Sequence, residues 1–480
     1  TFIMHILYLR YYQYTFEFSY EGLLFVYNFN EAKYIWALLE SIVIIWITLN
    51  NLKNIYLTET IMVMLNLLYF LPGVAQQAVT NEPWSYMFYF FLFWLMMEWW
   101  MKRIKPKQGS PFSKYFRMRN IDSYLKMLTI ISLIVTAMLM LYHHKSFSIA
   151  SFQETLLDVY EVRAEATNAG THWIIVNIKL WAAYLIVLLT AYYSYHRKWV
   201  LSAILVIAEF SLFLIEANRI FVFLELGALV VGIFRIDSNK TPIAMMLISV
   251  LLLIEVNVID VGLLFNDVFR RYTIVPNRIS GFYFDYFSTH TPDFLRSMYD
   301  RTSTLLGFHS IYVEKPISRM IGEVYLGWAA GCNTGLVGGC MFCFGYLAAI
   351  ISTFGYIMAF RLYEGTIATF QNPSVKYALA ITLVSLSINT YGLLANLINT
   401  NYFLMLYLTL APFANKKIQN DMWIWKKHLK YSKNSNFRFG LIVEKISMGI
   451  INELLRFYWD ECYRGYIETC TQELPALRKR

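Results

Sequence analysis

The sequence predicts an all-α, polytopic membrane protein with about 11 to 12 transmembrane helices and one large outer loop. Two observations lead to this prediction. Only 15% of the 480 residues are charged and 58% are hydrophobic, whereas a soluble chain carries about 25% charged residues. Apolar runs of about 17 to 25 residues, long enough to cross a hydrocarbon core of about 30 Å, recur along the chain. Together these properties exclude a string of soluble domains.

The apolar runs are expected to form one bundle over residues 1–413, including the outer loop. They cover about residues 33–50, 60–78, 84–101, 123–142, 172–194, 199–216, 219–235, 242–259, 332–360, 375–393 and 395–413. Residues 1–32 are aromatic and amphipathic, and form either a twelfth span or an interfacial segment. The run at 332–360 is longer than one span, so it is either tilted or entered from the loop by a re-entrant turn.

Lysine and arginine gather in alternate connections between the spans, and this sets the orientation. The basic connections are residues 102–119, 196–198, 235–240, 361–376 and the segment after 416. The positive-inside rule places them in the cytoplasm. The net charge of +9 is therefore explained by membrane topology, and no nucleic acid partner is expected. Residues 259–331 become a large loop on the outer side.

Residues 414–480 differ from the bundle and are predicted to be a basic cytoplasmic tail. Four lysines, Lys426, Lys427, Lys430 and Lys433, precede an amphipathic stretch at residues 442–458. A basic amphipathic helix of this kind binds anionic lipid at the inner leaflet. Docking to a partner protein is the alternative.

The chain has five cysteines: Cys332, Cys340, Cys343, Cys462 and Cys470. Cys340 and Cys343 have the Cys-x-x-Cys spacing of a metal or redox pair, but no second pair with zinc-like spacing follows. We therefore interpret the cysteines of the apolar run as packing thiols.

The large outer loop contains six arginines but only one lysine. A guanidinium group binds two phosphate oxygens at once, which an ammonium group cannot do. Arg163 and Arg219 lie in other connections that face the same side. We therefore predict a site for the pyrophosphate of a polyprenyl-linked substrate, with the candidates Arg163, Arg219, Arg270, Arg271 and Arg278. The alternative is that each arginine pairs with a nearby carboxylate or extends to the interface.

The loop is also rich in Tyr and Phe. Tyr272, Tyr283 and Tyr286 are candidates to stack on sugar rings, and an aromatic belt at the membrane interface is the alternative. A general base for an acceptor hydroxyl must be a carboxylate or an imidazole within reach. The unranked candidates for this base are His290, Asp285 and Glu323.

Several other chemistries are not expected. The chain has no Gly-x-x-x-x-Gly-Lys-Ser/Thr phosphate loop, so ATP-driven transport is not predicted. It has no His-Glu-x-x-His motif, and Glu82 stands alone in the first outer connection, where a metal-dependent transferase would need an acidic pair. We therefore expect no cofactor and no metal ion.

Two segments of the loop resemble the O-antigen polymerases, the Wzy-type polymerases of oligosaccharide repeat units. The first is Arg270-Arg271-Tyr-Thr-Ile-Val-Pro276 followed by Gly281-Phe-Tyr-Phe-Asp-Tyr-Phe287. The second is Ile321-Gly-Glu-Val-Tyr325 with Asn333-Thr-Gly-Leu-Val-Gly338, which is similar to the family's Asn-x-Gly entry into the next span. Val162-Arg163 also fits the family. Gly338-Gly339 departs from it, because an acidic residue often follows the second glycine, and the tail has no counterpart.

The resemblance implies a GT-C-like bundle at a bacterial inner membrane, with the large loop in the periplasm and the C-terminus in the cytoplasm. Such an enzyme transfers a glycan from undecaprenyl pyrophosphate to the next lipid-linked repeat unit, without nucleotide sugar. Its expected partners are the undecaprenyl-pyrophosphate-linked oligosaccharide and membrane lipids, and a chain-length regulator is left open. Fixed guanidinium groups fit this reaction because they stabilise the charge on the leaving pyrophosphate.

Two other functions remain as alternatives. An O-antigen ligase uses similar lipid donors and also has a large late outer loop. A non-catalytic flippase or transporter would carry the same lipid-linked oligosaccharide, but such proteins tend to show internal repeats and charged groups near the membrane midplane. No repeat is evident here, and the ionisable residues within the spans are scattered at Glu40, Glu98, Glu209, Glu225 and Glu255.

Overall fold

The structure is a computed structural model, and it confirms an all-helical, multi-pass membrane protein. It describes residues 28–52, 56–105, 121–143, 173–216, 219–236, 240–258, 269, 272–295, 312, 317–327, 331–367, 373–389 and 401–411. Over these ranges every regular element is a helix. Five helical runs are long and apolar enough to cross a membrane: Glu31–Asn51, Leu57–Gln77, Asp122–Tyr142, Ile174–Tyr195 and Leu336–Ile367. Contacts divide the chain into Thr1–Lys416 and Lys417–Arg480. The predicted tail and residues 1–27 lie outside the described residues.

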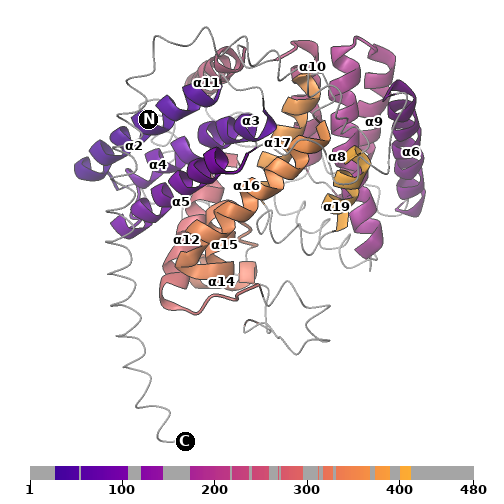
Figure 1. Cartoon of the computed structure of the whole chain (residues 1–480). Helices are drawn as coiled ribbons and strands as arrows, with labels where there is room; N and C mark the ends of the chain where they lie inside the picture. Colours follow the sequence, from indigo (N-terminus) through magenta and orange to yellow (C-terminus); the bar gives the residue numbers. More distant parts are fainter. Residues whose placement is uncertain are drawn as a thin grey trace, which may run out of the picture. The chain divides into compact units, whose positions relative to one another are not determined.

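The helices follow the order of the apolar runs (Figure 1). They are α2 (Glu31–Asn51), α3 (Leu57–Leu65), η2 (Asn66–Phe70), α4 (Leu71–Gln77), α5 (Trp84–Arg103), α6 (Ile121–Tyr142), α8 (Trp173–Tyr195), α9 (Trp199–Glu216), α10 (Arg219–Ile233), α11 (Thr241–Val258), α12 (Val275–Thr289), α14 (Ile317–Leu326), α15 (Leu336–Phe344), η7 (Gly345–Leu347), α16 (Ala348–Ile367), α17 (Pro373–Asn389) and α19 (Asn401–Leu410). Each predicted span overlaps one of these helices or a continuous run of them. Two helices, α12 and α14, lie inside the predicted outer loop and were not anticipated.

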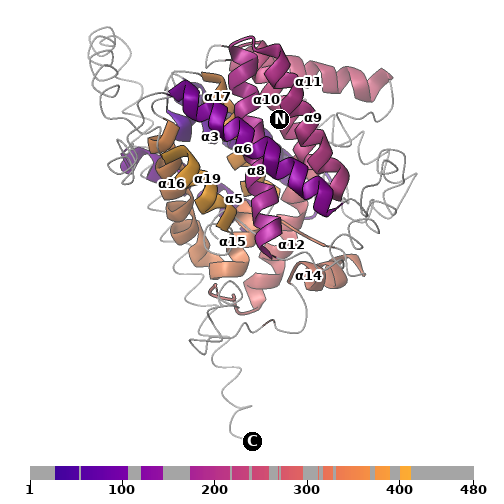
Figure 2. The same cartoon turned by 90° about the vertical axis from the view of Figure 1, so that its right-hand side faces the viewer.

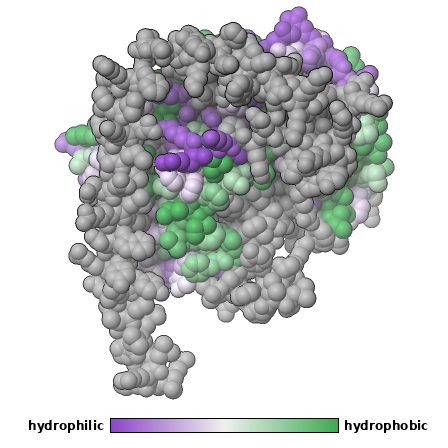
Figure 3. Space-filling model, viewed as in Figure 1, coloured by the Kyte–Doolittle hydropathy of each residue, from purple (hydrophilic) through white to green (hydrophobic). Residues whose placement is uncertain are grey.

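The outward faces of several helices are apolar, as a lipid environment requires. On α6, Ile130, Ile134, Met138 and Leu141 are all more than half exposed and recur every three or four residues, so they lie on one side of the helix. Hydrophobic surface is visible on the face shown in Figure 3. Soluble proteins rarely expose large contiguous apolar patches, so these exposed apolar side chains agree with a helix that faces lipid.

Helix α8 is central to one group of helices. It packs against α6, α9, α10, α17 and α19 (Figure 2). Its side chains are buried on every side from Trp181 to Leu189, which is typical of a helix surrounded by other helices.

The long apolar run at 332–360 is broken rather than merely tilted. Helix α15 ends at Phe344, Gly345 has φ +56°, and α16 begins at Ala348 after one 3-10 turn. Glycine adopts this positive φ without the steric cost that a side chain would impose. The break lies beside the end of α12, because the Asp293 backbone N–H donates to the Phe342 carbonyl at 2.9 Å.

Helix α12 packs into the bundle at very short range. Ser280 Oγ is 2.9 Å from Tyr69 Oη in η2 and 2.9 Å from Thr334 Oγ1 before α15. A Cβ added at Gly73 would lie 2.5 Å from Asn277 Oδ1, and one added at Gly338 would lie 3.0 Å from Ser280 Cα. Glycine therefore lets α4 and α15 approach α12 closely. The first part of the predicted loop is consequently an integral helix of the fold.

The two ends of α5 mark the two sides of the bundle. At its basic end, Arg361 Nη2 donates to the Met101 carbonyl at 2.8 Å and Arg361 Nε to the Ile104 carbonyl at 3.1 Å. This contact joins two connections that the charge pattern assigns to the same side. The other end begins at Trp84, directly after Glu82. A helix of 20 residues is about 30 Å long, so Glu82 and Arg361 lie about one hydrocarbon thickness apart.

Candidate functional site

Helix α12 presents a row of functional side chains along one face. Arg278, Phe282, Asp285, Tyr286 and His290 are separated by steps of three or four residues or are adjacent in sequence, so their side chains follow one another along the helix. The helix begins with Pro276 near its first position, where the fixed φ and the missing N–H of proline are tolerated. The helix ends at Thr289, and the next residue, His290, is its C-cap and has an extended backbone. We call this row the α12 face.

Arg278 is held at the start of the α12 face by an ion pair. Its Nη1 donates to Glu82 Oε1 at 2.7 Å, and the side chains are 13% and 4% exposed. The guanidinium carbon lies 4.8 Å from the centre of the Phe282 ring, a cation–π distance. Thr80 Oγ1 also donates to the Glu82 carboxylate. The arginine therefore has a carboxylate partner, but one that lies 196 residues away in the chain.

Helix α14 closes against the middle of the α12 face. The rings of Phe282 and Tyr325 stack with centroids 4.7 Å apart and an interplanar angle of 9°. The Tyr325 hydroxyl donates to Asp285 Oδ2 at 2.6 Å. Burial, and then the neighbouring Asp285 carboxylate, raise the pKa of the Tyr325 phenol above its ordinary value. Tyr325 thus remains a neutral donor that orients the exposed carboxylate of Asp285.

His290 lies at the end of the α12 face and is exposed. Its ring stacks on Tyr286 with centroids 3.9 Å apart and an interplanar angle of 11°. His290 Nδ1 is 2.9 Å from the Tyr286 carbonyl and 3.0 Å from Thr289 Oγ1. A carbonyl can only accept, so a proton on Nδ1 makes Nε2 the basic nitrogen of the neutral ring. Tyr286 is anchored in turn by its hydroxyl, which donates to Met320 Sδ at 3.8 Å.

The other sequence candidates are placed differently. Tyr283 is fully buried and donates to the Cys332 carbonyl at 3.1 Å, so it packs the core between α12 and α15. Tyr272 is half-buried before α12, and Glu323 is half-buried on α14, two residues from Tyr325. Arg219 begins α10, but its side chain is outside the described residues, as are Arg163, Arg270 and Arg271 altogether.

The structure therefore places Arg278, Asp285, Tyr286 and His290 in a row about 18 Å long on α12 and adds partners that the sequence did not suggest. Glu82, set apart as a lone acid, is the ion-pair partner of Arg278. The helical spacing of the α12 face was available in the sequence, but the pairing with Glu82 had no local signal. One face now combines a guanidinium group, a carboxylate bonded to a phenol, an imidazole and stacked rings. These groups can bind an anion, accept a proton and contact a sugar ring.

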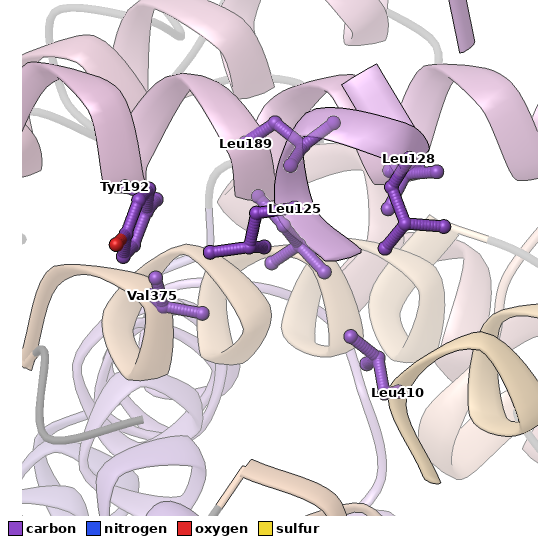
Figure 4. A pocket seen from close by; sticks show the side chains of 8 residues that line it. Leu125, Leu128, Leu189, Tyr192, Val375 and Leu410 are labelled. Atoms are coloured by element: carbon purple, nitrogen blue, oxygen red, sulfur yellow. The ribbon is translucent and has the colours of Figure 1, made fainter. Parts of the chain in front are cut away.

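Other features of the bundle do not add to this site. No group of three or more His, Cys, Asp or Glu side chains that could hold a metal ion occurs among the residues described. An apolar pocket lies between α6, α8, α17 and α19 (Figure 4), and Leu125, Leu128, Leu189, Tyr192, Val375 and Leu410 are among its lining residues. None of them belongs to the α12 face. Cys332, Cys340 and Cys343 are buried and unbridged, as expected for packing thiols.

Comparison of the chain with protein-family models, with curated proteins and with solved structures gives no match in any of the three. The class that the fold defines is that of multi-pass, all-helical membrane proteins. A more specific functional assignment depends on the chemistry of the α12 face and on the sequence motifs of the loop.

Proposed function

We propose that the protein is a membrane glycosyltransferase that polymerises lipid-linked oligosaccharide repeat units. It would transfer the glycan from undecaprenyl pyrophosphate to the next lipid-linked unit, at the periplasmic face of a bacterial inner membrane and within a GT-C-like bundle. The observation that supports this proposal best is the α12 face itself. It places Arg278 and Asp285 on one 15-residue helix and His290 at the C-cap of that helix, near the end of α5 that lies opposite to its basic end.

The arginine suits the leaving group. When the bond between the sugar C1 and the pyrophosphate oxygen breaks, the electron pair stays on that oxygen and negative charge develops there. A fixed guanidinium group stabilises this charge most effectively in a partly dry site, and Arg278 is only 13% exposed. A pyrophosphate would replace Glu82 as its partner, because phosphate oxygens accept forked hydrogen bonds from a guanidinium group. Arg163, Arg219, Arg270 and Arg271 belong to this proposal as further pyrophosphate-binding residues.

The remainder of the α12 face suits the acceptor. A bond between the acceptor hydroxyl oxygen and C1 forms while its proton passes to a base. Asp285 and His290 are both exposed and flank Tyr286 on one helix, so either can reach a hydroxyl bound there. Tyr286 presents an aromatic ring suited to a sugar, while His290 covers one of its faces. Glu323, on α14, remains the third candidate base.

The test uses purified full-length protein in lipid nanodiscs with lipid-linked repeat units as sole substrate. We expect ladders of longer lipid-linked glycans, and about 10² to 10³-fold slower lengthening by Arg278→Ala. Arg319→Ala is the matched control, since Arg319 is exposed on the neighbouring α14. If product forms only after a lipid A-core acceptor is added, the protein is a ligase and not a polymerase. In cells, loss of a polymerase leaves single-unit glycans on the surface, whereas loss of a flippase leaves none.

A further inference from the structure

Two glutamates lie opposite each other inside the group of helices around α8. Glu209 is in α9 and Glu225 is in α10, and the two helices pack against each other and against α8. Glu209 is seven residues before the end of α9 and Glu225 six residues after the start of α10. At about 1.5 Å per residue, both lie about 10 Å from the turn that joins these helices. They therefore share one depth within the bundle.

Among the described residues, neither glutamate forms an ion pair with a basic side chain. Glu209 is 0% exposed, and neither of its carboxylate oxygens has a hydrogen-bond partner. Glu225 is 3% exposed; its Oε1 accepts from Thr190 Oγ1 in α8 at 2.6 Å, and its Oε2 has no partner. The two carboxyl groups interact electrostatically with each other. Of the four carboxylate oxygens, three therefore have no hydrogen-bond partner and the fourth has one hydroxyl group.

Three other buried glutamates of the described chain, Glu59, Glu98 and Glu364, are bonded to several polar groups or to an arginine. Glu98 accepts from Asn51 Nδ2 at 3.1 Å and from Asn66 Nδ2 at 3.2 Å. Glu59 and Glu364 both bond to Arg361, at 3.2 and 2.7 Å. These hydrogen bonds and the arginine compensate part of the cost of burying a carboxylate. Glu209 and Glu225 lack such a set of hydrogen-bond donors and have no arginine partner, so the negative charge of the pair must be reduced by a bound cation or proton.

Among the side chains that the structure describes, the charged groups on the helices packed around the pair are remote or engaged elsewhere. Lys179, on α8, is eleven residues from Thr190, about 16 Å along the helix. On α6, Asp122 accepts from Tyr192 at the basic end of α8, and Lys126 is exposed one turn further along. On α17, Lys376 lies over the Tyr377 ring near the start of the helix. None of these groups is positioned to compensate the pair.

A proton fits this site better than a metal ion does. Two carboxylates in a medium of low dielectric constant cannot both remain ionised, because desolvation and mutual repulsion each cost several kcal/mol. Calcium requires six to eight oxygen ligands, and magnesium keeps several waters. The carbonyls of α8, α9 and α10 are occupied within regular helices, which leaves too few oxygens for a cation.

We propose that Glu209 and Glu225 form a proton-binding site that joins α9 to α10. One proton binds to one carboxylate oxygen, and the resulting O–H donates to the other carboxylate. Thr190 orients Glu225 by its hydrogen bond. Binding of the proton removes one negative charge and creates an interhelical hydrogen bond, whereas release restores repulsion between the helices. The packing of α9 on α10 therefore depends on occupancy of the site. The inference does not rest on the glycosyltransferase proposal.

Infrared spectroscopy of the full-length protein in sodium-free nanodiscs tests this site, since a protonated carboxyl has a carbonyl-stretch band that a carboxylate lacks. We expect a band at neutral pH that is weaker in Glu209→Gln/Glu225→Gln than in the wild type. Glutamine is isosteric with the protonated acid, so the fold is retained. In Glu225→Gln, the remaining band should disappear at lower pH than in the wild type, because the second negative charge is absent. Glu59→Gln, which removes an acid paired with Arg361, is the matched control.

Two outcomes would overturn the inference. If the band is the same in the wild type and the double variant, the pair carries no proton. If sodium chloride abolishes the wild-type band at constant pH while choline chloride does not, the site binds a metal cation instead. The sodium measurement needs no variant, so it decides the question even if a substitution impairs folding.

Discussion

Replacing Arg278 by alanine should destabilise the protein as well as slow its reaction. The substitution removes the partner of Glu82, whose side chain is only 4% exposed. Glu82 then keeps the hydrogen bond from Thr80 and the nearby Lys33 ammonium, which donates to the Glu82 backbone carbonyl. Its carboxylate loses the guanidinium group that pairs with it directly. The interaction with the Phe282 ring, at 4.8 Å from the guanidinium carbon, is lost as well. Both losses act on the contact between α12 and the connection that precedes α5.

The size of the effect follows from the burial of the pair. Breaking a buried ion pair by removing one partner costs about 3 to 5 kcal/mol. Because the Lys33 ammonium remains close to Glu82 after the substitution, we expect a cost at the lower end of this range, about 2 to 3 kcal/mol. Arg278→Lys should recover only part of this loss, since lysine keeps the charge but not the planar fork. Glu82→Ala/Arg278→Ala should be less destabilised than the sum of the two single variants.

Thermal unfolding in detergent measures these differences. The buried thiols of Cys340 and Cys343 become accessible to a thiol-reactive fluorescent dye when the bundle opens, so the chain carries its own reporter. Arg319→Ala, on exposed α14 surface, should melt like the wild type. Energies of the Glu82 and Arg278 variants that add to within about 0.5 kcal/mol would show that the two sites are independent. That result would refute the ion pair as a fixed element of the α12 face.

Three further variants test other contacts. Gly338→Ala should cost about 1 to 3 kcal/mol by overpacking, because the new Cβ would lie 2.5 Å from Thr334 Cγ2, whereas Gly227→Ala, with its nearest atom at 3.9 Å, should be neutral or stabilising in the same melting assay. Arg361→Ala should cost about 3 to 5 kcal/mol, because it leaves two buried carboxylates unpaired; a melting temperature within 1 °C or so of wild type would contradict this. Burial raises the pKa of Tyr325 in the fold, so the stability due to the neutral phenol is complete below its unfolded pKa of about 10 and declines as pH rises above it. Tyr325→Phe should lose less stability at alkaline pH, as followed by intrinsic fluorescence, and an identical alkaline loss in both proteins would reject this assignment.

The arrangement of spans could be predicted from the sequence because hydrocarbon imposes a simple length and polarity rule. The apolar runs correspond to helices from α2 to α19. The position of the break at Gly345 could not be predicted, since the sequence showed only that the apolar run was too long for one span. Helix α12 was missed because its 15 residues are strongly aromatic and carry Arg278 and Asp285, a composition equally typical of a surface loop.

The contacts of the site could not be predicted, because they join distant parts of the chain. Arg278 was a candidate from its residue type alone, but the choice of Glu82 as partner depends on how α4, α5 and α12 pack. Similarly, Glu209 and Glu225 looked scattered along the sequence, and only the antiparallel packing of α9 and α10 brings them to one depth. The sequence therefore predicted which residue types could form the site, whereas the pairs that these side chains form could be identified only from the structure.

The most direct test of the proposed activity is the reaction of purified protein with lipid-linked repeat units alone. We expect a ladder of lipid-linked glycans that grows by whole repeat units without ATP or nucleotide sugar. Arg278→Ala should nearly abolish this ladder, and Arg319→Ala should leave it unchanged. Folded protein in nanodiscs that leaves the single units unchanged under these conditions would contradict it.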